Sequence, residues 1–358
     1  MRDSAEEPSF VRVQPSFSEW GKMLEAFYDR TIYQTPEWLK FLAQTQKGQI
    51  VFAAFRHDDR LLGYFCGLIV SKLGLKVLGS PLPGWTTSYM GLNLLPGVPR
   101  RPAIDALMRF AFEGLKCVHV ELMDRHLTAD DANLLCCEYQ IFHGFEIDLT
   151  QREDQLFANM TSACRRCIRR AEKTGVIIEE ARDIGFADEY YEQLQEVFQK
   201  QSLVPTYGRD RVRALIRCLD GNNHLLLLRA RDAQGRCIAT AIFLGMNETM
   251  YFWGGASRQA FQGSRPNEAI HWYAMRYWKR RGMCRYDMGG GGEYKRKYGG
   301  YDIRVPWLQK SKHAWVKPLR TLAKHMVYGR QRVHGITERF IFGHPNQRAA
   351  RHGVTYLV

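Results

Sequence analysis

One order of strands, turns and helix occurs twice in this chain, and that repetition constrains the fold more than any other feature. In the first half, alternating and apolar runs predict strands at 50–55, 61–71 and 73–78, a long loop, a helix near 103–116 and a strand at 119–123. In the second half the same order is predicted, with strands at 224–231, 237–245 and 249–253, a loop, a helix from Pro266 and a strand at 284–288. Two copies of one unit are the simplest explanation, and chance recurrence of common α/β elements is the alternative.

Corresponding positions in the two halves carry the same residue types. Arg60 matches Arg236 across the two hairpins, and Asp124 falls near Asp287. We therefore expect an α/β (α+β) protein with one lobe at 1–150, a second lobe at 151–308 that carries the active site, and a basic extension at 309–358. Each lobe is expected to be a mixed, mostly antiparallel sheet flanked by helices.

The positive charge of the chain is concentrated at its end. The net charge is +14, and the residues from Gln309 onward include ten Lys or Arg and one acid, Glu338. A solvated extension is one interpretation, and an anionic partner such as a lipid headgroup, a polyanionic glycan precursor or RNA is the other. Trp315 and Leu319 recur beside Lys317 at helical spacing, which fits a helix on an anionic membrane surface and equally a docked terminal helix.

Several classes of protein are disfavoured by composition. The acidic start MRDSAEEPSF does not resemble a signal peptide, and no apolar run reaches the roughly 20 residues of a membrane span. We expect a cytoplasmic protein, with peripheral contact at the cytoplasmic face of the membrane through the basic tail. The nine cysteines have no disulfide-framework or zinc-ligand spacing, so reduced thiols and no metal site are expected.

A glycine run followed by lysines and tyrosines marks the most informative stretch. The predicted strand ending at Asp287 leads into four glycines, 289–292, and then into Tyr294-Lys295-Arg296-Lys297-Tyr298-Gly299. Because four adjacent glycines are costly to order, we expect their backbone to approach something closely.

Two hairpin strands, a third strand, a helix and an adjacent strand resemble an N-acyltransferase lobe of the GNAT type, and two such lobes resemble the Fem family of peptidyltransferases. The likeness spans about 33–306. It is carried by the motifs Pro36-Glu37-Trp38-Leu39, Lys279-Arg280-Arg281-Gly282, Tyr286-Asp287-Met288-Gly289-Gly290, the basic segment 165–173 and, most specifically, the segment 294–299.

Catalytic roles are expected for two residues, Lys295 from the resemblance and Asp287 from its place at a strand end beside the glycine run. Lys295 occupies the place of the family's lysine and would steady the oxyanion of acyl transfer or a phosphate, with Lys297 as the substitute. Asp287 would act as general base, or would hold the glycine loop through backbone N–H groups. Gly290 and Gly291 would present N–H groups to a carbonyl or phosphate, and a plain turn is the alternative.

A single amphipathic helix from Gln155 to Lys173 is also predicted. Its polar face carries like charges at i,i+4 spacing, which disfavour a bare helix and would be relieved by a phosphate-bearing ligand. Pairing with Glu179, Glu180 and Asp183 is the alternative. The residues assigned to substrate binding on this face are Arg165, Arg166, Arg169 and Arg170.

Four further residues are assigned to ligand contacts. Arg258 and Arg265 flank the loop before the Pro266 helix and would contact phosphate, while Trp85 and Tyr89 would line a cleft between the lobes. His271 is assigned to the solvated side of its helix.

The acyl donor is left open between acyl-CoA, an acyl-carrier protein and aminoacyl-tRNA. The loop at 258–266 does not match the usual GNAT pyrophosphate motif, and no segment pair has the heptads of a tRNA-binding coiled-coil arm.

The expected function is N-acyl transfer, in which an acyl or aminoacyl group moves onto an amine of a cell-envelope or polysaccharide precursor. The alternatives are acetyl-CoA-dependent N-acetylation of an amino sugar or small amine, and non-catalytic binding of RNA or anionic lipid. The expected partner is an anionic, phosphate-bearing small molecule or lipid-linked substrate.

Overall fold

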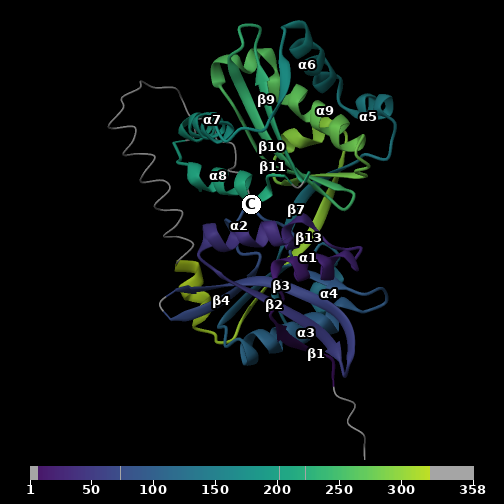
Figure 1. Ribbon diagram of the computed structural model, residues 1–358, viewed down its shortest axis with the longest axis vertical. Coiled ribbons are helices and arrows are strands. Elements are labelled where there is room, and N and C mark those ends of the chain that lie inside the picture. Colours follow the sequence, from purple (N-terminus) through teal and green to yellow (C-terminus); the bar gives the residue numbers. More distant parts are fainter. Residues whose placement is uncertain (1–6, 73, 201, 222, 323–358) are drawn as a thin grey trace, which may run out of the picture. The chain divides into compact units, whose positions relative to one another are not determined.

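The computed structural model describes residues 7–72, 74–200, 202–221 and 223–322, and it divides into two compact units (Figure 1). Residues 7–143 and 304–320 belong to the first unit, and residues 144–303 belong to the second. Each unit contains a mixed, mostly antiparallel sheet flanked by helices, so the fold class predicted from the sequence is confirmed.

In the first unit, the strands lie in the order β1, β2, β3, β4, β6, β13, and β5 pairs with β3. Among the described residues of this unit, β4 and β6 run parallel and the other pairs here run antiparallel. The strands are β1 Ser9–Val13, β2 Gln49–His57, β3 Arg60–Lys72, β4 Leu75–Ser80, β5 Leu92–Leu94, β6 His119–Met123 and β13 Tyr301–Ser311. The helical segments are α1 Phe17–Glu25, η1 Ile32–Gln34, α2 Pro36–Gln46, α3 Arg100–Arg109, η2 Phe110–Gly114 and α4 Ala129–Leu134.

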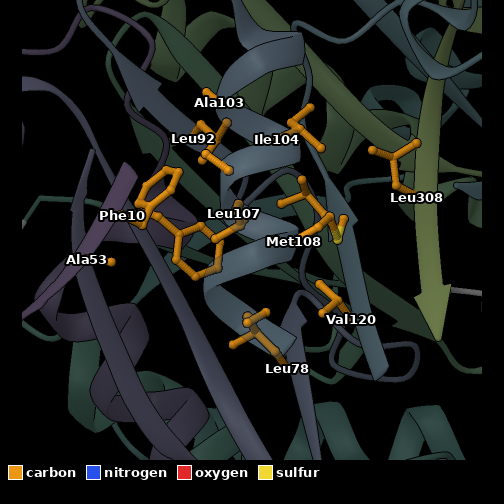
Figure 2. Packing of buried hydrophobic residues seen from close by; sticks show 14 of the residues in the cluster. Phe10, Ala53, Leu78, Leu92, Ala103, Ile104, Leu107, Met108, Val120 and Leu308 are labelled. Carbon is orange, nitrogen blue, oxygen red and sulfur yellow. The ribbon is translucent and has the colours of Figure 1, made fainter. Parts of the chain in front are cut away.

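Helices cover both faces of this sheet because successive side chains of a strand point to opposite faces. On β2, Ala53 belongs to the apolar cluster that includes Leu107 of α3, whereas the neighbouring Phe52 lies against Trp20 of α1, with ring centroids 4.5 Å apart. Figure 2 shows this cluster, in which Leu308 of β13 lies on the same side as Met108 of α3. The late strand β13 is therefore part of the core of the first unit.

In the second unit, the strands lie in the order β8, β9, β10, β11, β12, β7, and only β11 and β12 run parallel. The strands are β7 Glu138–Asp148, β8 Ile177–Ala181, β9 Leu225–Arg231, β10 Cys237–Met246, β11 Thr249–Ser257 and β12 Arg285–Gly290. The helical segments are α5 Glu153–Asn159, α6 Ser162–Lys173, α7 Phe186–Lys200, α8 Arg209–Leu219, η3 Gln259–Ser264, α9 Pro266–Lys279 and η4 Glu293–Tyr298.

Here too the two faces of the sheet are covered by different helices. Phe243 of β10 belongs to the apolar cluster that includes Ala274 of α9. Thr240 lies three residues before Phe243 on the same strand, and its hydroxyl donates to the Gln193 side-chain oxygen of α7 at 2.8 Å. Because side chains on a strand alternate, α9 and α7 lie on opposite faces.

The strands of the two units follow one order, in which the final strand of each unit comes from the other half of the sequence. β7 follows β6 along the chain but pairs with β12, and β13 follows β12 but pairs with β6. The sequence-based divisions at 150/151 and 308/309 therefore differ from the compact units, which divide at 143/144 and 303/304. The basic extension also differs, because residues 309–320 belong to the first unit, while its residues 323–358 lie outside the described part.

Two predicted elements have different bounds. β11 continues through the residues Gly254–Ser257, which were expected to end it, because they pair with residues 239–242 of β10. The predicted helix at 155–173 is two helices, α5 and α6, because Met160 is extended and Thr161 caps α6, its side chain accepting from the Cys164 N–H. None of the helices within the described ranges combines the length and apolarity needed to cross a membrane.

Candidate active site

The parallel strands β11 and β12 part from one another in the second unit. Their pairing runs from Thr249 and Arg285 to Tyr251 and Asp287, whereas β11 itself continues to Ser257. A bulge in β11 coincides with this point, because the β10–β11 register shifts at Trp253. A bulge bends and twists a strand, so it accounts for the separation of β11 from β12 beyond Asp287.

Asp287 lies where the two strands part, and its side chain is buried with 2% exposure. Its Oδ1 accepts from the Gly289 N–H at 2.7 Å. Gly289, Gly291 and Gly292 have φ of 70°, 65° and 87°, a region that favours glycine. The glycine run is therefore needed for its backbone conformation, and Asp287 holds the first turn of it.

Lys295 of η4 returns toward this glycine run. It is 2% exposed, and its Nζ donates to the carbonyl oxygens of Met288 and Gly290, each at 2.6 Å. Burial lowers the pKa of Lys295 to about 8, and the Asp287 carboxylate raises it in part. The structure thus brings together three residues that the sequence assigned to the site: Lys295, Asp287 and Gly290.

Lys297 points to a different partner. Its Nζ forms an ion pair of 2.8 Å with Glu268 of α9, a residue that is 8% exposed. The Lys297 carbonyl also accepts from the Thr161 N–H at 2.9 Å, which attaches the start of α6 to η4. Lys297 therefore joins three elements around the site.

His271 was assigned to the solvated side of α9, and this prediction was wrong. The side chain is 5% exposed, and its Nδ1 lies 2.6 Å from the Tyr286 hydroxyl. The rings of Phe252 and Tyr298 each lie 4.8 Å from the imidazole. Burial, followed by the charges of Lys297 and Lys295, lowers the pKa of His271 to about 3, so the imidazole is neutral above acidic pH.

The basic face of α6 has one arginine that is engaged within the fold. Arg165 donates to the Ala158 carbonyl at 2.7 Å and to the Met160 carbonyl, so it satisfies the end of α5. A phosphate-binding role was predicted for it, and its described contacts are with backbone carbonyls. Arg165 therefore ties α6 to α5.

The other three arginines of this face, Arg166, Arg169 and Arg170, are exposed. Their predicted alternative partners are occupied by other groups. Glu179 and Asp183 pair with Arg229 at 3.4 and 2.7 Å, and Glu180 accepts from the Tyr273 hydroxyl at 2.8 Å. The alternative of pairing with these acids is therefore wrong. No carboxylate in the described ranges lies within 4.0 Å of these three guanidinium groups.

Arg258 and Arg265 flank η3, as predicted, with different surroundings. Arg258 pairs with Glu192 of α7 at 3.0 Å. Arg265 is exposed and has φ of 58°, and it occupies the N-cap position of α9 without a capping hydrogen bond from its side chain. Trp85 and Tyr89 lie in the first unit and are buried, with 4% and 1% exposure.

Sequence reasoning did not identify an aromatic group beside the β11 bulge. The ring of Trp253 lies 5.4 Å from that of Tyr207 and 6.3 Å from that of Tyr190 on α7. The two tyrosine hydroxyls lie 2.9 Å apart. These residues come from three separate segments of the chain. The sequence signal for a close contact at this place was therefore the presence of glycines in β11.

Within the described residues of 7–322, no three His, Cys, Asp or Glu side chains are grouped so that they could hold a metal ion. The site instead offers a buried lysine, a buried carboxylate and glycine backbone at a strand end.

Comparison with known proteins places this geometry in a known fold. Residues 158–298 match the family model described as an acetyltransferase (GNAT) domain. A search of curated protein sequences finds no match.

Solved structures resemble a larger part of the chain. FemX has a TM-score of 0.67 at 13% identity and covers 83% of this chain and 97% of its own. The L-PGS structure from Bacillus licheniformis has a TM-score of 0.55 at 10% identity and covers 90% and 99%. The tandem GNAT protein from the clavulanic acid biosynthesis pathway has a TM-score of 0.54 at 12% identity and covers 85% and 98%.

Lys295, Asp287 and the glycine run all lie inside the matched segment. The chain thus shares the fold of FemX and of the tandem GNAT protein, and its second unit contains the segment that matches the GNAT domain model.

Proposed function

We propose that this chain is an N-acyltransferase whose second unit moves an acyl or aminoacyl group onto an amine of a cell-envelope or polysaccharide precursor. The observation that carries it is the group at the parting of β11 and β12, where buried Lys295 and Asp287 meet the glycine run inside the GNAT segment. The Fem-like fold supports the same reaction class.

In this reaction the amine nitrogen attacks the acyl carbonyl carbon and forms a C–N bond. The C–S bond of a thioester donor, or the C–O bond of an aminoacyl ester, then breaks. Asp287 takes the amine proton, which passes to the leaving sulfur or oxygen. Carbonyl oxygens occupy two of the three N–H donors of the Lys295 ammonium, and we assign the third to the oxyanion or a phosphate.

The donor is proposed from the same set that the sequence left open: acyl-CoA, an acyl-carrier protein or aminoacyl-tRNA. The GNAT match favours acetyl-CoA, so N-acetylation of an amino sugar or small amine is the second candidate function. The exposed face of Arg166, Arg169 and Arg170 supports a substrate that bears phosphate.

Peripheral membrane contact through the tail is a separate proposal. Trp315 and Leu319 are 47% and 48% exposed, an arrangement that suits the interface of a bilayer. However, Lys317 already pairs with Glu138 at 2.7 Å, so at least one tail cation is engaged within the first unit.

A thermal-shift panel followed by turnover tests the function. Acetyl-CoA, longer acyl-CoAs, charged tRNA and nucleotide-linked amino sugars are each added, since a ligand at about 100 times its Kd raises the unfolding free energy by about 2.7 kcal/mol. The ligand that stabilises the protein is then used in an amine-acylation assay with wild type and Lys295→Ala. We expect turnover to fall about 100-fold in the variant while ligand binding persists. Turnover equal to wild type would refute the role of Lys295, and absence of acylation with every donor would refute the function.

A further inference from the structure

The aromatic group beside the β11 bulge has an unused hydrogen-bond donor. Trp253 is 7% exposed, and within the described residues its indole N–H has no acceptor at hydrogen-bond distance. An indole N–H can only donate, and leaving it buried without a partner costs about 1–3 kcal/mol. A ligand oxygen at this position would supply the missing acceptor.

The neighbouring hydroxyls offer a second donor. Tyr190 and Tyr207 share one hydrogen bond of 2.9 Å, in which one hydroxyl donates to the other. That bond uses only one of the two hydroxyl protons, so the remaining O–H can donate to an acceptor. Tyr207 is partly exposed, whereas Tyr190 is fully buried, so the Tyr207 side of the pair is the one that solvent reaches.

The backbone of β11 is built to admit this arrangement. A Cβ atom at Gly254 would lie 2.4 Å from the Tyr190 hydroxyl oxygen, which is closer than real contacts allow. Gly254 follows the bulge residue Trp253 directly. Glycine at this position therefore lets a hydroxyl approach the strand at the point where it leaves β12.

We propose that Trp253, Tyr190 and Tyr207 form the binding site for the amine acceptor, and that this acceptor is an amino sugar. The carbon face of a sugar ring would pack on the partly exposed ring of Tyr207, while its ring-edge oxygens accept from the indole N–H and from a tyrosine hydroxyl. A simple alkylamine has no such oxygens. The site lies on β11 at the bulge, two residues beyond Tyr251, which pairs with the catalytic candidate Asp287 of β12.

The ring of Trp278 provides a matched control for that of Trp253. It is also buried, at 1% exposure, and its indole N–H likewise has no acceptor among the described residues. However, its ring packs in the apolar core of the second unit against Gly245, where a Cβ would lie 2.4 Å away. Replacing either tryptophan by phenylalanine removes one N–H and keeps an aromatic ring.

The test measures the Kd of the full-length protein for glucosamine by titration with NMR detection, with cyclohexylamine as a ring amine that lacks hydroxyl oxygens. We expect glucosamine to bind at least about fivefold more tightly than cyclohexylamine, since each added hydrogen bond contributes a factor of this size. Trp253→Phe and Tyr207→Phe should each weaken glucosamine binding about fivefold, and Trp278→Phe should leave it unchanged.

The Gly254→Ala variant supplies an independent measurement. The added methyl group displaces the Tyr190 hydroxyl and leaves Trp253 and Tyr207 in the sequence, so glucosamine binding should weaken while the melting temperature reports whether the fold is kept. Equal affinity for both amines, or equal weakening by Trp253→Phe and Trp278→Phe, would overturn the site.

This site rests on the proposed function. The results that refute the site must therefore be distinguishable from the results that refute the function. Glucosamine binding that depends on Trp253, without acyl transfer from any donor, would support the site and refute the reaction. Acylation of cyclohexylamine without glucosamine binding would support the reaction and refute the site.

Discussion

Asp124 directly follows β6 and Asp287 lies on β12, the equivalent strand of the other unit, and the two make the same hydrogen bond to the N–H two residues later. Oδ1 of Asp124 accepts from the His126 N–H at 2.9 Å, and Oδ1 of Asp287 accepts from the Gly289 N–H at 2.7 Å. Their electrostatic surroundings differ, because Asp124 pairs with Arg100 at 2.6 Å, whereas Asp287 acts on Lys295. The first aspartate is thus part of a structural ion pair, and the second is coupled to a titrating lysine.

This difference predicts opposite effects of the same substitution. Asp124→Asn removes one charge of a buried pair, so we expect the free energy of unfolding to fall by about 3 kcal/mol with acyl-transfer kcat unchanged. Asp287→Asn should lower kcat about 100-fold, because a neutral amide cannot take the amine proton. Urea unfolding and steady-state kinetics measure both quantities. An Asp287→Asn enzyme with wild-type kcat would exclude the general base.

The pKa of Lys295 predicts an alkaline limit to activity. If the charged ammonium stabilises the oxyanion, kcat/KM calculated for the neutral amine should fall about tenfold per pH unit above the Lys295 pKa of about 8. Asp287 raises this pKa, so in Asp287→Asn the limit should move to lower pH in the residual activity. The pH profile of kcat/KM measures the shift.

A matched carboxylate controls for this effect. Asp302 is 46% exposed in its side chain and pairs with Arg296. Asp302→Asn should leave the alkaline limit in place, because solvent screens its charge. A limit that does not respond to Asp287→Asn would show that a group other than Lys295 titrates.

His271 predicts a dependence of stability on pH at the acidic side. Its pKa is lowered from the ordinary 6.5 to about 3 in the folded protein, so between these values the unfolded chain binds a proton that the folded chain does not. Stability is therefore fully present above pH 6.5 and is lost as pH falls toward 3, at up to about 1.4 kcal/mol per pH unit.

Comparing His271→Gln with His143→Gln measures this contribution. His143 is exposed, so its replacement should leave the pH dependence unchanged. In His271→Gln, the slope of unfolding free energy against pH between about 6 and 4 should fall by close to the contribution of one bound proton, which is about 1.4 kcal/mol per pH unit. Equal slopes in wild type and His271→Gln would contradict the burial of a neutral imidazole.

The sequence predicted the repeated fold because hydrophobic periodicity and turn residues are local signals. The strand at 119–123 has the predicted bounds, and the strands predicted at 50–55 and 61–71 lie within β2 and β3. The exchange of β7 and β13 between the units could not be predicted, since β7 pairs with a strand that follows it by more than 130 residues. Strand pairing at that distance leaves no local pattern.

The candidate site was predictable only where residues are close in sequence. Lys295, Asp287 and the glycines lie within one short segment, so a motif could identify them together. His271 was misplaced because its position on the helix face is decided by Tyr286 and Phe252, which approach from other strands. Tyr190, Tyr207 and Trp253 meet only through tertiary packing, so no sequence pattern connects them.

The exposed arginines of α6 predict a ligand affinity that depends on salt. Arg166, Arg169 and Arg170 repel one another on one helix face, and a diphosphate would relieve that repulsion while accepting their N–H groups. In the triple change to Gln, we expect the Kd for UDP-N-acetylglucosamine to rise about tenfold at low salt. The difference from wild type should shrink as ionic strength rises, because salt screens exposed charges. Calorimetric titration at two salt concentrations measures both effects.

A second triple variant, with Arg56, Arg60 and Arg101 changed to Gln, removes the same charge from exposed positions of the first unit and should leave Kd near its wild-type value. Equal weakening by the two triples would show that total charge alone governs binding, and would exclude a site on α6.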